Sequence, residues 1–172
     1  MQVMTSLLTI GTALALTVLS VGTQDAPEKV RVGIYDNRAI AVAYAPSKYN
    51  PVAEKMKERK QAEQAGDKKR IAELDAWGEK HQREVHRMGF GRVPVDRLLA
   101  HVADRIPDVA RAAGVDVIAW QCDYTAPGIE VVDVTDELVR LFDPTERTLK
   151  IVADLKQREP VDLDEIEAGH EH

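Results

Sequence analysis

The sequence predicts an α+β fold, in which helices cover a small three-stranded sheet and a charged helical hairpin projects from it. Three observations lead to this prediction. Val30, Val32 and Ile34 alternate with other residues, which is the period of a strand with one buried face. Residues 51–87 are rich in Ala, Glu, Lys, Arg and Gln, which favour helix. Residues 95–106 space their apolar side chains three and four apart, as an amphipathic helix does.

The N-terminal segment predicts export. Residues 1–22 carry no charged side chain and consist mostly of Leu, Ala, Val, Ile, Thr, Gly and Ser, which is typical of a signal peptide. Small residues at Ser20 and Gly22 allow cleavage after Gly22. Because no Lys or Arg stands near Met1, an uncleaved membrane anchor is the alternative. We therefore expect a periplasmic or secreted protein, anchored to the membrane only through this segment if it is not cleaved.

Length and charge divide the rest of the chain. With 172 residues, 44% hydrophobic and 30% charged, the chain fits one globular domain, which we place at residues 23–158. Of the 29 acidic residues, six lie in residues 159–172 without a Lys or Arg, which leaves 23 acidic and 23 basic residues elsewhere. This tail is therefore predicted to be solvated and mobile. The neutral body argues against a nucleic-acid partner, which needs a clustered basic surface.

The first strand, at Val30–Tyr35, ends where polar residues begin at Asp36. The run Arg38–Ala45 that follows is nearly all apolar, and its periodicity fits either a helix or a strand. Pro46 ends the run in both cases.

Two helices, at 51–65 and 67–88, are predicted to form the hairpin. Gly66 and Asp67 separate them as a helix stop signal and a helix start signal. The second helix has one narrow apolar stripe, formed by Ile71, Leu74, Trp77, His81, Val85 and Met88. Such a stripe can join two helices while the rest of their surface stays in water. We therefore expect the hairpin to project into solvent, with His81 packed in the stripe rather than binding a metal.

The second half of the chain alternates helices with two further strands. An amphipathic helix is predicted at Val95–Ile106, and Pro107 kinks or restarts it. The segment Val115–Trp120 is apolar enough to be a central strand. The remaining predicted elements are a strand at Ile129–Val132, a helix at Val134–Phe142 capped by Thr135 or Asp133, and a helix at Thr145–Lys156 capped by Asp143.

The order of these elements resembles the Skp/OmpH family of periplasmic chaperones. The matching segments are VRVGIYDNRAI, and later ADRIPDVARAAGVDVIAW leading to IEVVDVTDELVRLF. The resemblance implies a small trimeric sheet body with helical arms that hold unfolded outer-membrane proteins. The chain is also similar to uncharacterised exported bacterial proteins with a comparable order of strands and hairpin.

The first functional hypothesis is an exported bacterial binding or chaperone-like protein. Its hairpin would contact a protein partner or an unfolded polypeptide. Three short strands leave two sheet edges, which soluble proteins rarely expose, so we expect a homo-oligomer, a trimer first and a dimer second. A monomer whose edges are blunted by Arg31 and Pro127 is the alternative.

The second hypothesis is a small extracytoplasmic enzyme or ligand-binding protein. Parallel strands bring their ends to one edge of a sheet, a common place for sites. The residues that could meet there are Asp36, Asn37, Arg38, Asp123 and Tyr124. The alternative for Asp36 and Arg38 is an Asx turn with a local ion pair. The sequence holds no catalytic or cofactor-binding motif, and its single cysteine, Cys122, allows no intrachain disulfide, so we expect binding rather than catalysis, without a cofactor or metal.

Overall fold

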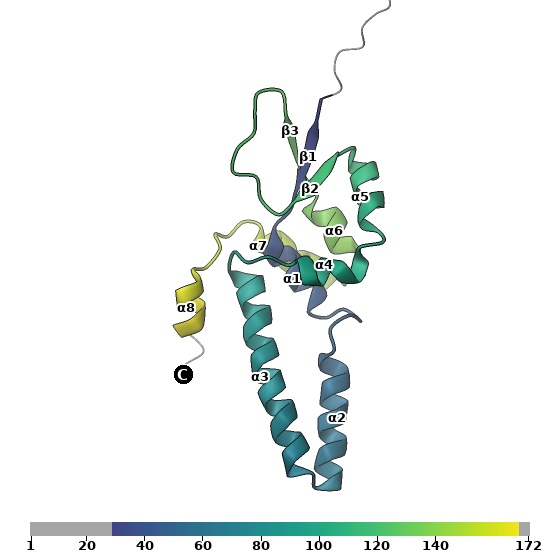
Figure 1. The fold of residues 1–172 in the computed structure, drawn as a ribbon, viewed down its shortest axis with the longest axis vertical. Helices are drawn as coiled ribbons and strands as arrows, with labels where there is room; N and C mark the ends of the chain where they lie inside the picture. Colours follow the sequence, from purple (N-terminus) through teal and green to yellow (C-terminus); the bar gives the residue numbers. More distant parts are fainter. Residues whose placement is uncertain (1–28, 169–172) are drawn as a thin grey trace, which may run out of the picture.

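The computed structural model describes residues 29–168, so the predicted signal segment and the last four residues lie outside it. A small sheet stands at one end, helices gather at its base, and a two-helix hairpin extends away from them (Figure 1). In chain order the elements are β1 (Arg31–Ile34), α1 (Asn37–Tyr44), α2 (Val52–Ala65), α3 (Lys68–Phe90), α4 (Asp96–Leu99), a 3-10 turn η1 (Ala100–Val102), α5 (Ile106–Ala113), β2 (Val117–Ala119), β3 (Glu130–Asp133), α6 (Thr135–Arg140), α7 (Glu146–Leu155) and α8 (Leu163–Ala168). None of the helices within residues 29–168 has the length and apolar character that crossing a membrane requires.

The sheet is parallel throughout, and its strand order is β2-β1-β3. The predicted α+β class with three strands is confirmed. The expectation that Val115–Trp120 forms the central strand is wrong, because β1 lies between the other two strands. Only three residues of that segment pair with β1, and Val117 keeps 51% of its surface exposed. An apolar composition alone therefore did not predict a central position.

Helix α1 lies at the centre of the core. It resolves the ambiguous run after the first strand as a helix, and it is buried on nearly every side. It packs against α3, α4, α6 and α7, and Ile40 is its largest fully buried side chain. A helix that is apolar all round is one that other elements enclose. The helices thus assemble around α1 more than around the strand that precedes it.

Within the part of the chain that the structure describes, helices cover one face of the sheet and leave the other open. Gly33 lies on the covered face, where an added Cβ would come within 3.2 Å of the Val115 and Val134 side chains. On the opposite face, Val32 pairs in register with Val117 and Val131, and these two edge valines are 51% and 41% exposed. The connection from β2 to β3 contains no helix. We call this side, formed by Val32, Val117 and Val131, the open sheet face.

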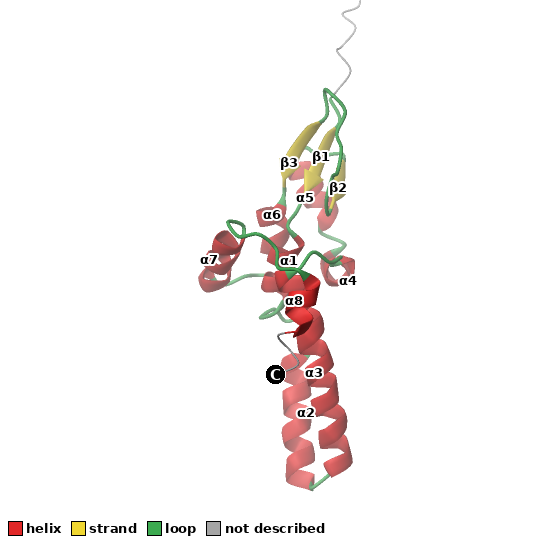
Figure 2. Ribbon diagram, turned by 90° about the vertical axis from the view of Figure 1, so that its left-hand side faces the viewer, coloured by secondary structure: helices red, strands yellow, loops and turns green. Residues whose placement is uncertain are grey.

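The hairpin of α2 and α3 projects from the body, as predicted (Figure 2). Gly66 ends α2 with a left-handed φ of 70°, and the Asp67 side chain caps α3 by accepting from the Arg70 amide. The two ends of the predicted apolar stripe pack against different parts of the protein. Leu74 is buried within the hairpin, whereas Met88 is buried against the core. The end of α3 is therefore part of the body.

Two predicted elements differ from the structure. The helix expected at Val95–Ile106 breaks into α4, η1 and a turn before α5 begins, although its apolar spacing continues across the break. Thr145, not Asp143, caps α7 by accepting from the Thr148 amide at 3.2 Å. Asp143 instead adopts a left-handed φ of 54° in the preceding turn.

The described part of the acidic tail is packed, which corrects the expectation of a solvated terminus. The Val161 amide donates to the Phe90 carbonyl at 2.9 Å. Helix α8 then lies against α3, with Ile166 only 9% exposed. An added Cβ on Gly91 would come within 2.6 Å of Leu163. Two apolar side chains in a segment with five acidic residues are therefore enough to dock it on the end of α3.

Candidate functional site

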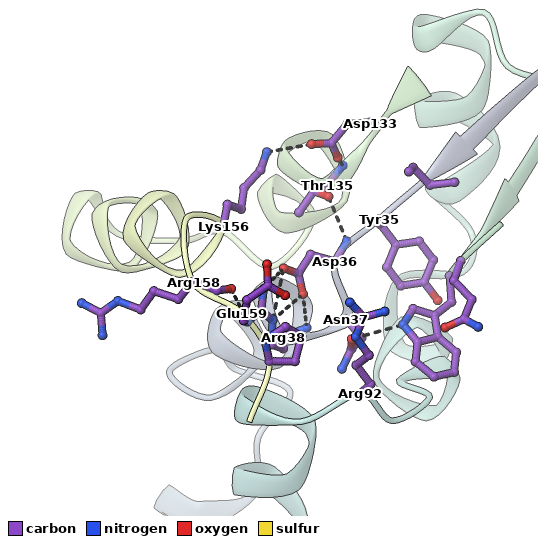
Figure 3. Close-up of a pocket in the computed structure, with 14 residues that line it drawn as sticks. Tyr35, Asp36, Asn37, Arg38, Arg92, Asp133, Thr135, Lys156, Arg158 and Glu159 are labelled. Atoms are coloured by element: carbon purple, nitrogen blue, oxygen red, sulfur yellow. Dashed lines mark hydrogen bonds and ion pairs between the residues drawn. The ribbon is translucent and has the colours of Figure 1, made fainter. Parts of the chain in front are cut away.

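A pocket of about 400 Å³ lies at the carboxyl ends of the strands (Figure 3). We call it the strand-edge pocket. It is lined from the ends of all three strands, from the start of α1, from the α3–α4 connection and from the segment after α7. Segments far apart in the sequence thus converge at the edge where parallel sheets commonly place their sites.

Asp36 and Arg38 line this pocket and form an ion pair with each other. The Asp36 carboxylate accepts from the Arg38 amide at 2.9 Å, which caps α1, and from Arg38 Nη2 at 2.7 Å. Arg38 Nη1 also donates to the Arg158 carbonyl at 2.8 Å. The Asp36 amide donates to Thr135 Oγ1 at 3.0 Å. The predicted alternative, an Asx turn with a local ion pair, is what these bonds form. Both side chains also line the pocket, and the bonds of the two residues join α1 to α6 and to the segment after α7.

Asn37 is fully engaged inside the protein. Its Nδ2 donates to the carbonyls of Met88 at 3.1 Å and Gly91 at 2.9 Å. Its Oδ1 accepts from the Trp120 indole Nε1 at 3.1 Å. The side chain is only 3% exposed, so Asn37 positions its neighbours and has little left to offer a ligand.

A second ion pair closes the β3 side of the pocket. Lys156 Nζ lies 2.9 Å from Asp133 Oδ2 and 3.3 Å from Asp136 Oδ1. Burial raises the pKa of the Asp133 carboxyl, but hydrogen bonds from Thr135 and Lys156 outweigh it and hold this pKa below its usual value. Burial likewise lowers the pKa of Lys156, and the two carboxylates raise it further than burial lowers it. Both partners of this pair therefore stay charged near neutral pH.

Asp123 and Tyr124 do not reach the strand-edge pocket. Tyr124 is 79% exposed, and Asp123 accepts from Gln121 Nε2 at 3.1 Å in an exposed loop. Trp120, the last residue of the predicted second strand, and Gln121, which follows it, line the pocket in their place. Asp123 and Tyr124 lie too far along the loop, which swings outward on its way to β3 (Figure 1).

Three lining residues come from segments distant in the sequence and were not predicted. Arg92, Lys156 and Glu159 line the pocket from the α3–α4 connection, from the end of α7 and from the segment after it. No local pattern marks these residues. These residues reach the strand ends only because α7 and α3 both pack against α1.

A second hollow, of about 690 Å³, lies between α2 and α3 near the base of the hairpin. We call it the hairpin groove. Its apolar lining comes from Val52, Met56, Leu74, Trp77 and Val85. Met56 is 66% exposed. Charged side chains of both helices surround these residues, so the groove has an apolar centre and a polar margin.

His81 is packed within this groove, as the sequence predicted. Its ring stacks on Trp77 with centroids 4.8 Å apart, and its Nε2 lies 3.0 Å from Asn50 Oδ1. Burial lowers the pKa of His81, and Arg97 adds to this, while Glu84 opposes it. His81 thus joins α3 to the segment before α2.

Comparison of the chain with protein-family models, curated proteins and solved structures finds no match.

Proposed function

We propose that this chain is an exported bacterial binding or chaperone-like protein, which holds a protein partner or an unfolded polypeptide in its hairpin groove. The observation that carries the proposal is an apolar groove on a projecting element, where Met56 is exposed and Trp77 is partly exposed. The order of elements on which the resemblance to Skp/OmpH chaperones rests favours the same function.

The side chains of the groove suit a partner that varies in sequence. Met56 is unbranched and polarisable, so it adapts to differently shaped apolar surfaces. Trp77 offers a large flat surface of the type that dominates binding energy in protein interfaces. Charged residues such as Lys55 and Glu79 stand around them, and an apolar centre with a polar rim is the usual anatomy of an interface.

The geometry favours a short segment as the bound part of the partner. The two helices lie closest near the Gly66 turn and spread apart toward the body (Figure 1). A hollow of about 690 Å³ accommodates a few side chains, which is the way a helix or an extended segment docks in a groove between helices. Contacts of this kind bind a polypeptide non-covalently, and no chemical reaction is needed.

The test uses the purified protein and reduced, unfolded lysozyme, whose aggregation is followed by light scattering. We expect the protein to suppress aggregation, and Met56→Gln to weaken the suppression by roughly fivefold or more, because it removes an accessible apolar anchor. Leu149→Gln is the matched control, since Leu149 is an exposed apolar residue on α7, outside the groove. Equal suppression by the wild type and Met56→Gln would contradict the proposal.

Export is tested separately. The protein is expressed with its native N-terminus, and the exported product is sequenced. We expect it to begin at Thr23. Full-length material that stays in the cytoplasm would remove the export part of the proposal and leave the groove part standing.

A further inference from the structure

The strand-edge pocket contains a cation that no carboxylate neutralises. Asp36 pairs with Arg38, and Asp133 pairs with Lys156. Arg158 extends its side chain away from the other labelled residues (Figure 3). Arg92 lines the pocket and is exposed. Within residues 29–168 no hydrogen bond or ion pair engages its guanidinium.

Aromatic side chains line the pocket together with Arg92. One of them is Tyr35 (Figure 3). Trp120 also lines the pocket, and its bond to Asn37 fixes the position of its ring. Burial, followed by the negative charge of Asp96, raises the pKa of Tyr35. Its hydroxyl therefore stays protonated near neutral pH and can donate a hydrogen bond.

We propose that the strand-edge pocket binds a small planar organic acid, whose carboxylate pairs with Arg92 and whose ring lies against Trp120. A guanidinium matches a carboxylate through two parallel N–H···O bonds. A flat ring gains from contact with the face of an indole. The volume of about 400 Å³ lies at the small end of the range for ligand pockets, which suits a ligand with one ring.

The charge balance of the pocket favours a carboxylate over a phosphate. Asp36 and Asp133 are already paired with Arg38 and Lys156, so within the described residues Glu159 is the lining carboxylate whose charge no ion pair offsets. One unpaired Arg92 balances a single negative charge, whereas a phosphate dianion would leave excess charge beside Glu159. By the same argument, the charge of Glu159 weakens binding of a carboxylate ligand, because no cation of the described chain forms an ion pair with Glu159.

The test is a titration of the purified protein with benzoate, followed through the indole N–H signal of Trp120 in NMR spectra. Trp77→Phe assigns the signal, since the chain has two Trp residues. We expect a saturable shift in the millimolar range or below. Benzamide has the same shape without the charge, and we expect it to bind at least roughly tenfold more weakly.

Two variants locate the carboxylate. We expect Arg92→Gln to weaken benzoate binding by roughly tenfold or more, and Arg158→Gln, whose side chain points away, to leave it unchanged. Glu159→Gln should strengthen binding, and this result does not depend on how Arg92→Gln folds. No saturable shift, equal binding of benzamide, equal weakening by both arginine variants, or no gain in Glu159→Gln would each overturn the proposal. Aggregation suppression in these variants stays at the wild-type level if the two sites are independent.

Discussion

Asn37 shows how one side chain can join three parts of the fold. Its amide bonds to the end of α3, to the connection after it and to Trp120 at the end of β2. All three partners are more than fifty residues away in the sequence. The residue that we considered as a ligand-binding candidate is therefore first of all a connector between the sheet and the hairpin.

We expect Asn37→Ala to lower the free energy of unfolding by about 2–4 kcal/mol, because it leaves two carbonyls and an indole N–H without their partner. Trp120→Phe should cost less, since it removes only one of the three bonds. Urea unfolding followed by circular dichroism measures both. A change below about 0.5 kcal/mol in Asn37→Ala, the size of an ordinary surface substitution, would show that these bonds contribute nothing net.

His81 should make stability depend on pH. Its pKa in the folded protein is lowered by burial, so the unfolded chain takes up the proton first as pH falls. This contribution is complete above about pH 6.5, the ordinary value for histidine, and is lost as pH falls through the lower folded pKa. In His81→Gln, which can still bond to Asn50, we expect a smaller loss of stability on acidification than in the wild type. Identical pH profiles in thermal unfolding would contradict this.

At the residue scale the sequence predicted contacts that are local and missed those that are distant. An Asx turn at Asp36 with an ion pair to Arg38 was one of the predicted alternatives, because it needs only neighbouring residues. Arg92 and Lys156 reach the same pocket only through the packing of whole helices. A pattern within a few residues holds no information about such packing.

Among the elements, α8 departs furthest from what its composition suggests. Acidic residues surround Leu163 and Ile166, yet these two side chains dock on the end of α3 beside Gly91. The net charge of a segment therefore did not decide whether it packs. The apolar residues that it contains decided it.

We expect truncation after Arg158 to lower the melting temperature by about 3–6 °C, because it exposes the surface under Ile166 and removes the bond to Phe90. Gly91→Ala should have a similar effect, since its Cβ would displace Leu163. Gly78→Ala is the control: nothing lies within 4 Å of its added Cβ, and in mid-helix it should stabilise by about 0.5–1 kcal/mol. Calorimetry that shows no change on truncation would mean that α8 adds nothing to stability.

Removal of Lys55–Arg83, with a short Gly-Ser linker closing the gap, should leave a folded body. Val85 and Met88 remain in this variant and continue to pack on the core. We expect cooperative thermal unfolding to persist and the suppression of lysozyme aggregation to be lost. A variant without a cooperative transition would show that the body depends on the hairpin.

At the element scale, the prediction was accurate where a helix stop or start residue separated two helical segments. Gly66 and Asp67 placed the hairpin turn within one residue. It failed at Val95–Ile106, because the apolar spacing of a helix continues through a break that only tertiary packing imposes. For the run that became α1, burial on all sides removed the periodicity that distinguishes a helix from a strand.

At the scale of the whole molecule, the sheet is incompletely covered. Among residues 29–168, no strand pairs with the outer edge of β2 or of β3, and the open sheet face exposes Val117 and Val131. Parallel sheets are usually buried on both faces, so association of copies through this region would complete the sheet's covering. The fold of one chain could be predicted from its patterns, whereas its assembly depends on surfaces that no local pattern describes.

We expect light scattering at micromolar concentration to give a mass above that of one chain, with a trimer first and a dimer second. Val117→Lys should reduce this mass, because it places a charge on the open sheet face. Lys150→Glu, a charge change on α7, away from the sheet, is the control. A wild-type mass of one chain that does not rise with concentration would exclude this assembly.

The described chain enters at β1, and the Gly66 turn lies at the opposite end of the molecule (Figures 1 and 2). If the protein is anchored to a membrane through residues that precede Lys29, the Gly66 turn would be the end of the described chain that lies furthest from the anchor. With 23 residues, α3 is about 35 Å long, and the sheet end adds to that length. If residues 1–22 stay in a bilayer, the groove would lie at a fixed distance from the membrane surface. Only a polypeptide at that distance from the membrane could then bind in it.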